Sequence, residues 1–223
     1  MKKNFVILVD WDGNMADSNR TKDVKLNPFC EQEFGKIPAW AKLPTVIHRE
    51  LHGRPMGEIF QKISLEVYKK EISYKKGVII TERLNKFIKS FYITRPLFPG
   101  ACEFYKRLKD MGYPIYILTG MEPYMIEAAL EYHHITDIFD GIYGAPATKE
   151  QNIVEILKKH PGARIVASGD AMSEYRATMA YPDTIFLAFD LENRTKRVFP
   201  DDVKVYTSYN EEVWNDLMEK MSI

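Results

Sequence analysis

The chain lacks several features that would place it in a specialised class of protein. It has only two cysteines, Cys30 and Cys102, far apart in the sequence, so no disulfide framework or cysteine metal motif is expected. No apolar run approaches the length of a transmembrane helix, and no internal repeat or low-complexity tract is present. The apolar residues after Met1 are too few for a signal peptide, because Asp10 interrupts them. We therefore expect a cytoplasmic protein with no membrane partner.

The chain also lacks an excess of charge of one sign. Its 31 basic and 31 acidic residues give a formal net charge of zero, which offers no support for a nucleic-acid partner or an anionic membrane surface. Apolar residues make up 45% of the sequence and charged residues 28%, as in ordinary globular proteins. A chain of 223 residues has room for one domain with an insertion. A monomer and a small homo-oligomer are both compatible with the sequence.

The most informative segment present is the one from Phe5 to Gly13. Five consecutive apolar residues predict a strand that is buried on both faces. Two carboxylates, Asp10 and Asp12, follow at once. Side chains at i and i+2 point the same way if the extended geometry continues, so both acids would converge at the carboxyl end of the strand. Open α/β sheets bind ligands there, and a divalent cation would relieve the repulsion between the two acids.

Strands alternate with helical patterns in the second half of the chain. The expected further strands cover 114–118, 141–143, 164–168, 184–188 and a short 203–206, and the expected helices cover 101–111, 123–133, 150–159, 173–179 and 210–221. This alternation predicts an α/β fold in which a Rossmann-like, doubly wound parallel sheet is covered by helices on both faces.

The stretch 18–95 breaks this rhythm. It contains helical patterns at 27–34, 45–51, 57–70 and 81–90, with prolines between them and no convincing buried strand. We interpret 18–95 as an inserted α-helical cap domain and 1–17 with 96–223 as the core domain. An insertion at the ligand-binding edge is well placed to act as a lid. In its turn at 52–57, Arg54 could bind a second phosphate or a carboxylate, although a solvated arginine is the alternative interpretation.

Further polar residues follow the other strands. In chain order they are Thr119, Gly120, Lys149, Asp170 and Glu174. A hydroxyl, a glycine and a helix start after the second strand suit a phosphate, because the hydroxyl and free backbone N–H groups donate to the anion. An acid at a second strand end, with another acid four residues later, adds carboxylates to the same edge of the sheet.

This ordered set resembles the four motifs of the haloacid dehalogenase superfamily. The motifs are an Asp-x-Asp-Gly (10–13), a Thr or Ser after the second strand (Thr119), a Lys (Lys149), and a Gly-Asp followed by another acid (169–174). The helical insertion after the first motif is similar to the subgroup with a helical cap, such as phosphoglycolate phosphatases and β-phosphoglucomutases. The resemblance implies a phosphatase that hydrolyses a small phosphorylated metabolite.

The resemblance also implies roles for the reacting residues. Asp10 would be the nucleophile that forms an aspartyl-phosphate, and Asp12 the general acid and base. Lys149 would offset negative charge beside Asp10. Thr119 and the N–H of Gly120 would hold the phosphoryl oxygens, so most of the catalysis would be positioning and charge stabilisation.

A magnesium ion is the implied cofactor. The resemblance implies that Asp10, the backbone carbonyl of Asp12, and Asp170 bind it, in keeping with the preference of Mg²⁺ for oxygen ligands. Glu174 would orient Lys149 or a metal-bound water, unless it only begins a helix.

Several alternatives remain open from the sequence. Lys158 and Lys159 are rivals to Lys149 as the motif lysine. A phosphonate-cleaving branch of the family can carry a Trp at the position of Trp11, but that branch lacks the second acid, and Asp12 also disfavours dehalogenation. A phosphomutase would use the same residues as a phosphatase. A catalytically weak regulatory or binding protein on the same fold is the alternative outside enzymes.

Overall fold

The computed structural model describes residues 4–51, 54–193 and 198–222, and the side chain of Lys22 lies outside this description. Residues 52 and 53 of the turn expected around Arg54 are likewise outside it. The chain divides into two compact units, one formed by 1–18 with 94–223 and the other by 19–93. The role of the smaller unit as a cap stays a prediction.

The larger unit is built on a parallel sheet. Its strands are β1 (Phe5–Val9), β2 (Ile115–Leu118), β3 (Gly141–Tyr143), β4 (Arg164–Gly169), β5 (Ile185–Phe189) and β6 (Val205–Tyr206). Within the described part of the chain the strand order is β3-β2-β1-β4-β5-β6, and every neighbouring pair is parallel. The predicted doubly wound α/β fold is confirmed. Because the chain moves outward on both sides of β1, the edge beyond β1 and β4 is where such sheets bind ligands.

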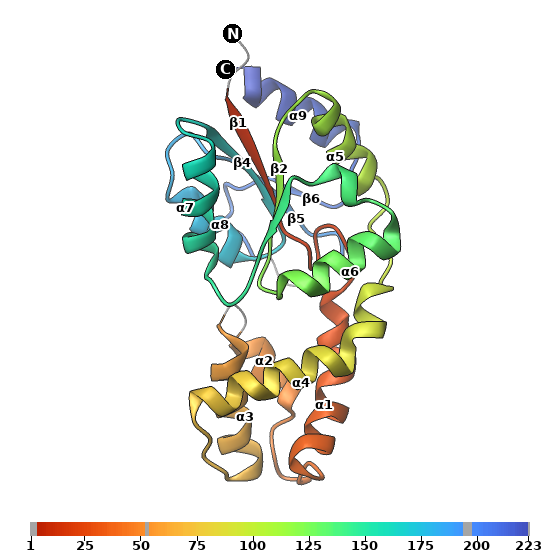
Figure 1. Ribbon diagram of the computed structural model, residues 1–223, viewed down its shortest axis with the longest axis vertical. Coiled ribbons are helices and arrows are strands. Elements are labelled where there is room, and N and C mark those ends of the chain that lie inside the picture. Colours follow the sequence, from red (N-terminus) through yellow and green to blue (C-terminus); the bar gives the residue numbers. More distant parts are fainter. Residues whose placement is uncertain (1–3, 52–53, 194–197, 223) are drawn as a thin grey trace. The chain divides into compact units, whose positions relative to one another are not determined.

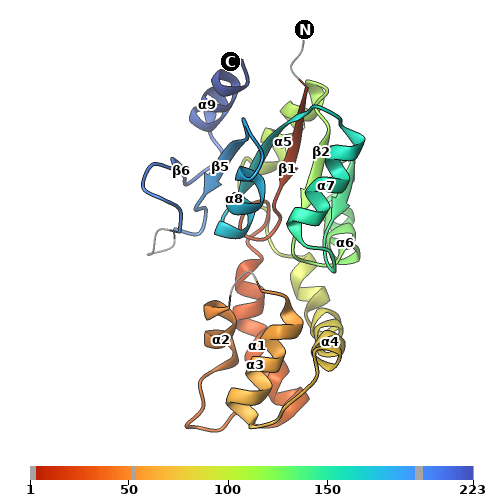
Figure 2. The same ribbon diagram turned by 90° about the vertical axis from the view of Figure 1, so that its left-hand side faces the viewer.

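Helices cover both faces of this sheet. Figures 1 and 2 show α7 (Lys149–Lys159) and α8 (Met172–Met179) on one face, and α5 (Ala101–Asp110), α6 (Pro123–His133) and α9 (Glu211–Ser222) on the other. A short 3₁₀ helix, Thr136–Ile138, precedes β3. All five residues of β1 are buried, as a strand covered on both faces requires.

One apolar layer fixes α7 against the sheet. Val6 and Leu8, which share one face of β1, belong to a buried cluster with Ile153 and Ile156 of α7 and Ala177 of α8. Alternate strand residues face the same side of a sheet, so Val6 and Leu8 of β1 lie on one face. They pack there against Ile153 and Ile156 of α7. This packing determines where the first turn of α7, which carries Lys149, lies above the sheet.

The smaller unit contains four helices among its described residues. They are α1 (Asn19–Phe34), α2 (Pro44–Glu50), α3 (Met56–Tyr68) and α4 (Tyr74–Ile93). Three predicted boundaries are wrong, because α1 begins at Asn19 rather than at 27, and α4 runs from 74 to 93 rather than from 81 to 90. The added turns of α1 have few buried apolar side chains, so apolar periodicity could not reveal them.

Close packing of α3 and α4 holds the smaller unit together. Ile80, Leu84 and Ile88 form a buried stripe on α4 with helical spacing. A Cβ atom on Gly77 would lie 2.3 Å from the carbonyl oxygen of Gly57, so the two backbones approach too closely for any other residue at position 77. In the described part of the chain, no helix combines the length and apolar character needed to cross a membrane.

Candidate active site

Asp10 lies directly beyond the end of β1. Its backbone N–H donates to the carbonyl of Ser168 at 3.1 Å, which continues the pairing with β4, and the residue is only 5% exposed. The extended geometry stops there, because Trp11 begins a turn whose carbonyl accepts the N–H groups of Met15 and Ala16 at 3.0 Å each. The backbone is therefore not extended from Asp10 to Asp12, and the two side chains are not placed on one face by strand geometry.

Asp12 lies instead in a tightly bonded loop. Its Oδ1 accepts a short hydrogen bond from the hydroxyl of Ser18. The loop is tied to the chain that returns from the insertion, since the N–H of Asp17 donates to the carbonyl of Pro96 at 3.0 Å. The guanidinium of Arg95 also donates to the Asp17 carboxylate at 2.8 Å. These bonds hold Asp12 beside the end of β1 without the help of strand geometry.

Lys149 is the lysine that reaches Asp10. Its Nζ donates to Asp10 Oδ1 at 2.7 Å and also to Glu174 Oε1. The residue opens α7 directly after Thr148, whose side chain and that of Gln151 form a reciprocal capping box. This cap fixes the first turn of α7 and directs Lys149 toward the sheet edge.

The two rival lysines have other partners. Lys158 pairs with Glu155 at 2.7 Å on the exposed side of α7. The ammonium of Lys159 lies 5.4 Å from the centre of the Tyr143 ring. The geometry therefore brings Lys149 into the candidate site and leaves both alternatives outside it.

Burial and mutual charge interactions shift the pKa values of Asp10, Lys149 and Glu174. Burial raises the pKa of Asp10 well above its ordinary value; Lys149 opposes this shift, while Glu174, Asp170 and Asp12 add to it. Burial would lower the pKa of Lys149, but the charges of Asp10 and Glu174 outweigh it and the pKa is raised. Burial would likewise raise the pKa of Glu174, yet the charge and hydrogen bond of Lys149 lower it. Lys149 therefore remains a cation among several carboxylates.

The end of β4 brings two more acids to this edge. Asp170 follows β4 directly, and Glu174 lies in the first turn of α8; both are buried. Gly169 makes the approach of Glu174 possible, because a Cβ atom at 169 would lie 2.8 Å from Glu174 Cγ and 3.0 Å from its Cβ. Those atoms are close to the backbone of α8 and cannot simply swing aside.

We predict that Gly169→Ala lowers the free energy of unfolding by about 1–3 kcal/mol, the usual effect of overpacking a core position. Gly120→Ala is the matched control, because no atom lies within 4 Å of a Cβ atom built at Gly120. Urea unfolding monitored by circular dichroism measures both variants. Equal stabilities for the two variants would show that Gly169 does not position Glu174.

Thr119 and Gly120 follow β2 as predicted. The N–H of Thr119 donates to the carbonyl of Tyr143 at 2.9 Å, and its buried hydroxyl oxygen accepts the N–H of Met121 at 3.1 Å. Since the oxygen is the acceptor in that bond, the hydroxyl hydrogen can donate to a ligand. Gly120 is exposed at the end of β2. The pair has the donor chemistry that an anion needs.

Arg54 lies in the smaller unit, just before α3. Its side chain is 65% exposed and pairs with Glu58 at 3.3 Å, a surface contact of small energetic weight. The described geometry resembles that of a solvated arginine in a surface ion pair. The substrate-binding role of Arg54 stays a prediction.

The predicted metal ligands offer oxygen donors but no chelating group of side chains. Among the described residues, no three or more His, Cys, Asp or Glu side chains are arranged to hold a metal ion. The expected ligands require only the carboxylates of Asp10 and Asp170 and one backbone carbonyl. Within the part of the chain that the structure describes, the buried Oε2 atom of Glu174 has no hydrogen-bond partner, and burial together with the charges of Glu174, Asp170 and Asp12 raises the pKa of Asp10. An oxygen-rich site with excess negative charge fits Mg²⁺.

A largely buried polar cluster behind Asp10 was missed by the sequence reasoning. Asn14, Tyr105, Ser168 and Tyr209 exchange hydrogen bonds there, and Asn14 also donates to the backbone carbonyl of Asp10 at 3.0 Å. Asn14 and Tyr209 are 195 residues apart in the chain. No local pattern could have joined these residues, because only the folded sheet brings them together.

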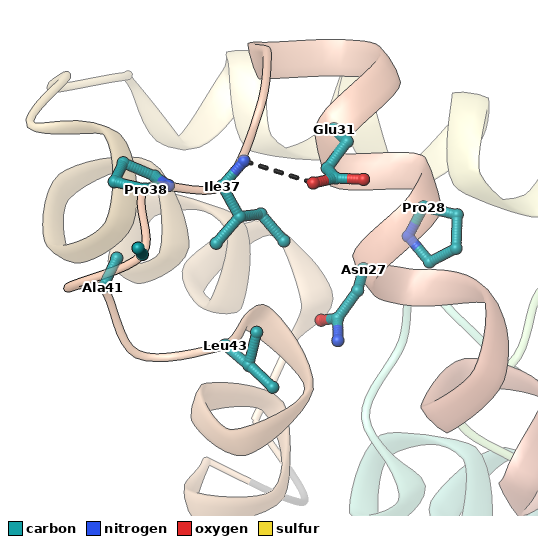
Figure 3. Close-up of a pocket in the computed structure, with 8 residues that line it drawn as sticks. Asn27, Pro28, Glu31, Ile37, Pro38, Ala41 and Leu43 are labelled. Atoms are coloured by element: carbon teal, nitrogen blue, oxygen red, sulfur yellow. Dashed lines mark hydrogen bonds between the residues drawn. The ribbon is translucent and has the colours of Figure 1, made fainter.

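A pocket of about 370 Å³ lies elsewhere, within the smaller unit. Figure 3 shows it between Asn27, Pro28 and Glu31 of α1 and the loop from Ile37 to Leu43. Its one carboxylate, that of Glu31, accepts the N–H of Ile37 at 3.3 Å. The residues that line this pocket include none of the predicted site residues.

Comparisons with known structures agree with this architecture. The chain is similar to a predicted phosphoglycolate phosphatase from Haemophilus somnus, with 16% identity, coverage of 85% of this chain and 86% of that one, and a TM-score of 0.65. It is similar to the magnesium-bound HAD-hydrolase YfnB from Bacillus subtilis (16% identity, coverage 97% and 100%, TM-score 0.65). It is also similar to CbbY from Rhodobacter sphaeroides in complex with xylulose-1,5-bisphosphate (17%, 92% and 95%, TM-score 0.72). At these identities the matches show a shared fold.

The family is established by a match of the sequence itself to a family model. No curated protein matches the chain. A family model described as haloacid dehalogenase-like hydrolase matches residues 6–177, a range that runs from β1 into α8 and includes every predicted catalytic residue. The chain therefore belongs to the haloacid dehalogenase-like hydrolases.

Proposed function

We propose that the protein is a Mg²⁺-dependent phosphatase that hydrolyses a small phosphate monoester through an aspartyl-phosphate. The observation that carries this proposal is the buried carboxylate of Asp10, held 2.7 Å from Lys149 at the carboxyl end of β1. Two of the similar structures support it by their descriptions, one as a predicted phosphoglycolate phosphatase and one as a complex with a sugar bisphosphate.

In the first step, a carboxylate oxygen of Asp10 attacks phosphorus. The new bond is the acyl phosphate, and the bond that breaks joins phosphorus to the ester oxygen of the substrate. Asp12 gives its proton to the departing alkoxide. The hydrogen bond from Ser18 to Asp12 supports this role, because it holds the carboxyl in one orientation.

In the second step, a water molecule attacks phosphorus of the aspartyl-phosphate. Asp12, now a carboxylate, takes the proton from that water, and the bond between phosphorus and Asp10 breaks to release inorganic phosphate. Both acids return to their starting states, so the cycle is balanced. Lys149 offsets the negative charge that Asp10 and the phosphoryl group bring together.

The groups that would hold the substrate and the metal follow from the site. The hydroxyl of Thr119 and the N–H of Gly120 would donate to phosphoryl oxygens, and Asp10 with Asp170 and the Asp12 carbonyl would hold Mg²⁺, with Glu174 beside them. When bound, Mg²⁺ supplies the positive charge that lets a phosphate anion approach Asp10. The magnesium described for YfnB supports this assignment.

The remaining expectations are proposals of the same kind. We propose that the smaller helical unit acts as a cap over the substrate and that Arg54 belongs to its substrate-facing surface. The partner would be a small phosphorylated metabolite, with no nucleic acid and no membrane, in the cytoplasm. The protein would be a monomer or a small homo-oligomer.

The purified full chain is expected to hydrolyse p-nitrophenyl phosphate only with Mg²⁺. Removal of the metal with EDTA should lower turnover by about 100-fold or more, because metal charge is worth several kcal/mol at such a transition state. Release of nitrophenolate is the measurement, and excess Mg²⁺ should restore it. Full activity in EDTA would contradict the metal dependence, and the absence of turnover with Mg²⁺ toward a panel of phosphate monoesters would contradict the phosphatase.

A further inference from the structure

Four polar side chains from separate parts of the larger unit meet behind Asp10; three of them are buried and the fourth, Tyr209, is half-buried. Asn14 comes from the turn after β1, Tyr105 from α5, Ser168 from β4, and Tyr209 from the segment before α9. None of the four has a role in the chemistry proposed above. Asn14 and Tyr105 are at most 1% exposed, so water does not satisfy their polar atoms.

The four side chains form a closed ring of hydrogen bonds. Asn14 Nδ2 donates to Ser168 Oγ at 3.0 Å, and Ser168 Oγ lies 2.6 Å from the hydroxyl of Tyr105. The Tyr105 hydroxyl lies 3.1 Å from that of Tyr209, which donates to Asn14 Oδ1 at 3.0 Å. A longer contact of 3.3 Å joins Asn14 Nδ2 to the Tyr105 oxygen across the ring.

The donors and acceptors of this ring can be counted. Because Tyr209 gives its hydrogen to Asn14 Oδ1, its oxygen is free to accept from Tyr105, whose oxygen accepts from Ser168. Ser168 in turn accepts from one N–H of Asn14. Each hydroxyl then donates once and accepts once within the ring. The second N–H of the Asn14 amide remains, and the backbone carbonyl of Asp10 accepts it at 3.0 Å.

Packing holds the ring in this one arrangement. Burial raises the pKa of Tyr105 and of Tyr209, so both phenols keep the hydrogens that the ring requires. The aromatic side chain of Tyr209 stacks on that of Phe189, with their centroids 4.4 Å apart. Gly100 has φ +81°, and a Cβ atom there would lie 2.8 Å from the carbonyl oxygen of Tyr209. Tyr209 is therefore fixed by contacts that do not involve its hydroxyl.

We propose that Asn14 is a positioning residue for the nucleophile: the ring orients its amide so that one N–H fixes the backbone carbonyl, and hence the peptide plane, of Asp10. This inference rests on the proposed function, in which Asp10 is the nucleophile. The peptide that follows Asp10 is planar, so a fixed carbonyl also fixes the backbone from which the carboxylate projects. Through Ser168, the ring joins the end of β1 to the end of β4, which carries Asp170.

The size of the effect follows from the geometry that the reaction requires. A reacting group displaced by about 1 Å can lose about 100-fold in rate, even when the change lies away from the chemistry. Supporting hydrogen bonds around active-site ligands typically account for about 10–100-fold in activity. Loss of the hydrogen-bonded ring should therefore lower kcat, while KM changes little because no ring residue is among the groups proposed above to hold the substrate.

Two variants test the proposal, and a third serves as the control for the first. Tyr209→Phe removes the hydroxyl that closes the ring and keeps the stacking on Phe189. Asn14→Asp keeps the shape but presents oxygen instead of N–H to the carbonyl of Asp10. Tyr116→Phe is the control for Tyr209→Phe. Tyr116 lies on β2, outside the hydrogen-bonded ring, and its hydroxyl is 2.8 Å from Nε2 of His160. The measurements are kcat and KM for p-nitrophenyl phosphate, the midpoint of thermal unfolding, and a crystal structure of Tyr209→Phe.

We expect Tyr209→Phe to lower kcat by about 10-fold or more with KM within about twofold, and the Asp10 peptide to rotate in its crystal structure. Tyr116→Phe should lower only the unfolding midpoint. If Tyr209→Phe and Tyr116→Phe behave alike, with kcat unchanged, the ring is structural and the proposal is wrong. If the wild-type chain hydrolyses no phosphate monoester, the proposed function fails instead. The crystal structure then decides the positioning alone, and an unmoved Asp10 peptide overturns it.

Discussion

Asp10→Asn is expected to lower kcat by about 10⁴-fold or more, because an amide oxygen is a far weaker nucleophile than a carboxylate and nucleophile variants lose catalysis on this scale. The change keeps the size of the side chain and its position beyond β1. It also removes one of the two carboxylates that pair with Lys149. The loss should therefore appear in kcat for every substrate, whatever its leaving group. Turnover of p-nitrophenyl phosphate and of an alkyl phosphate measures it.

The matched control for this variant is Asp183→Asn. Asp183 is exposed and has φ 56°, a left-handed conformation that asparagine also tolerates, and it contacts Arg164 only through its backbone carbonyl. The same chemical change there should leave activity and stability unaltered. A loss in both variants would point to a general effect of lost carboxylates rather than to a nucleophile.

Asp12→Asn separates the nucleophile from the acid and base. Proton transfer of this kind is typically worth about 10²–10⁴-fold, and it matters most when the leaving group is a poor one. The loss should therefore be larger for the alkyl phosphate than for the nitrophenyl ester. Mass spectrometry of the quenched Asp12→Asn protein should find phosphate on Asp10. Comparable turnover by Asp10→Asn and the wild type would contradict the aspartyl-phosphate mechanism.

Lys149→Met is expected to have the largest effect on stability. The ammonium of Lys149 is the cation between Asp10 and Glu174, and both carboxylates are buried. Removal of one partner from a buried ion pair typically costs about 3–5 kcal/mol, because the charge left behind has lost its compensation. The variant should also lose most of its activity, since the approach of a phosphate anion to Asp10 would then meet uncompensated negative charge.

A double variant separates the two effects. Lys149→Met combined with Glu174→Gln removes the cation and one of the carboxylates it neutralises, so part of the lost stability should return while activity stays low. Lys158→Met is the matched control, because its pairing with Glu155 is exposed and its loss should change stability by less than about 0.5 kcal/mol. Urea unfolding measures all three. A stable and inactive Lys149→Met protein would show that the buried carboxylates do not need this cation for folding.

The sheet was predictable because its signals are local. The apolar run of β1 and the alternation of short apolar strands with amphipathic helices are present in the sequence of each element. The boundaries of α5, α6 and α7 differ from the predicted ones by at most one residue, since caps such as Gly112 and Thr148 mark them. Elements whose burial is visible in their own sequence need no tertiary information.

The smaller unit was predicted less well for the converse reason. The first turns of α1 and of α4 contain few buried side chains, and α1 continues through Pro28. A proline inside a helical pattern usually leads to a predicted helix boundary, because proline lacks the backbone N–H that a helix interior uses. Packing of α1 and α4 against their neighbours stabilises helical turns whose own sequences carry no apolar pattern that predicts a helix.

The sequence by itself determined that Asp10 and Asp170 meet, because parallel strands bring their carboxyl ends to one edge. The tertiary structure alone decided which lysine reaches Asp10, since Lys149, Lys158 and Lys159 belong to one helix and only its packing on the sheet selects the first. It also decided the ring around Asn14, whose members lie far apart in the chain. A hydrogen-bond network between distant segments depends on distances that exist only once the sheet and its helices have packed.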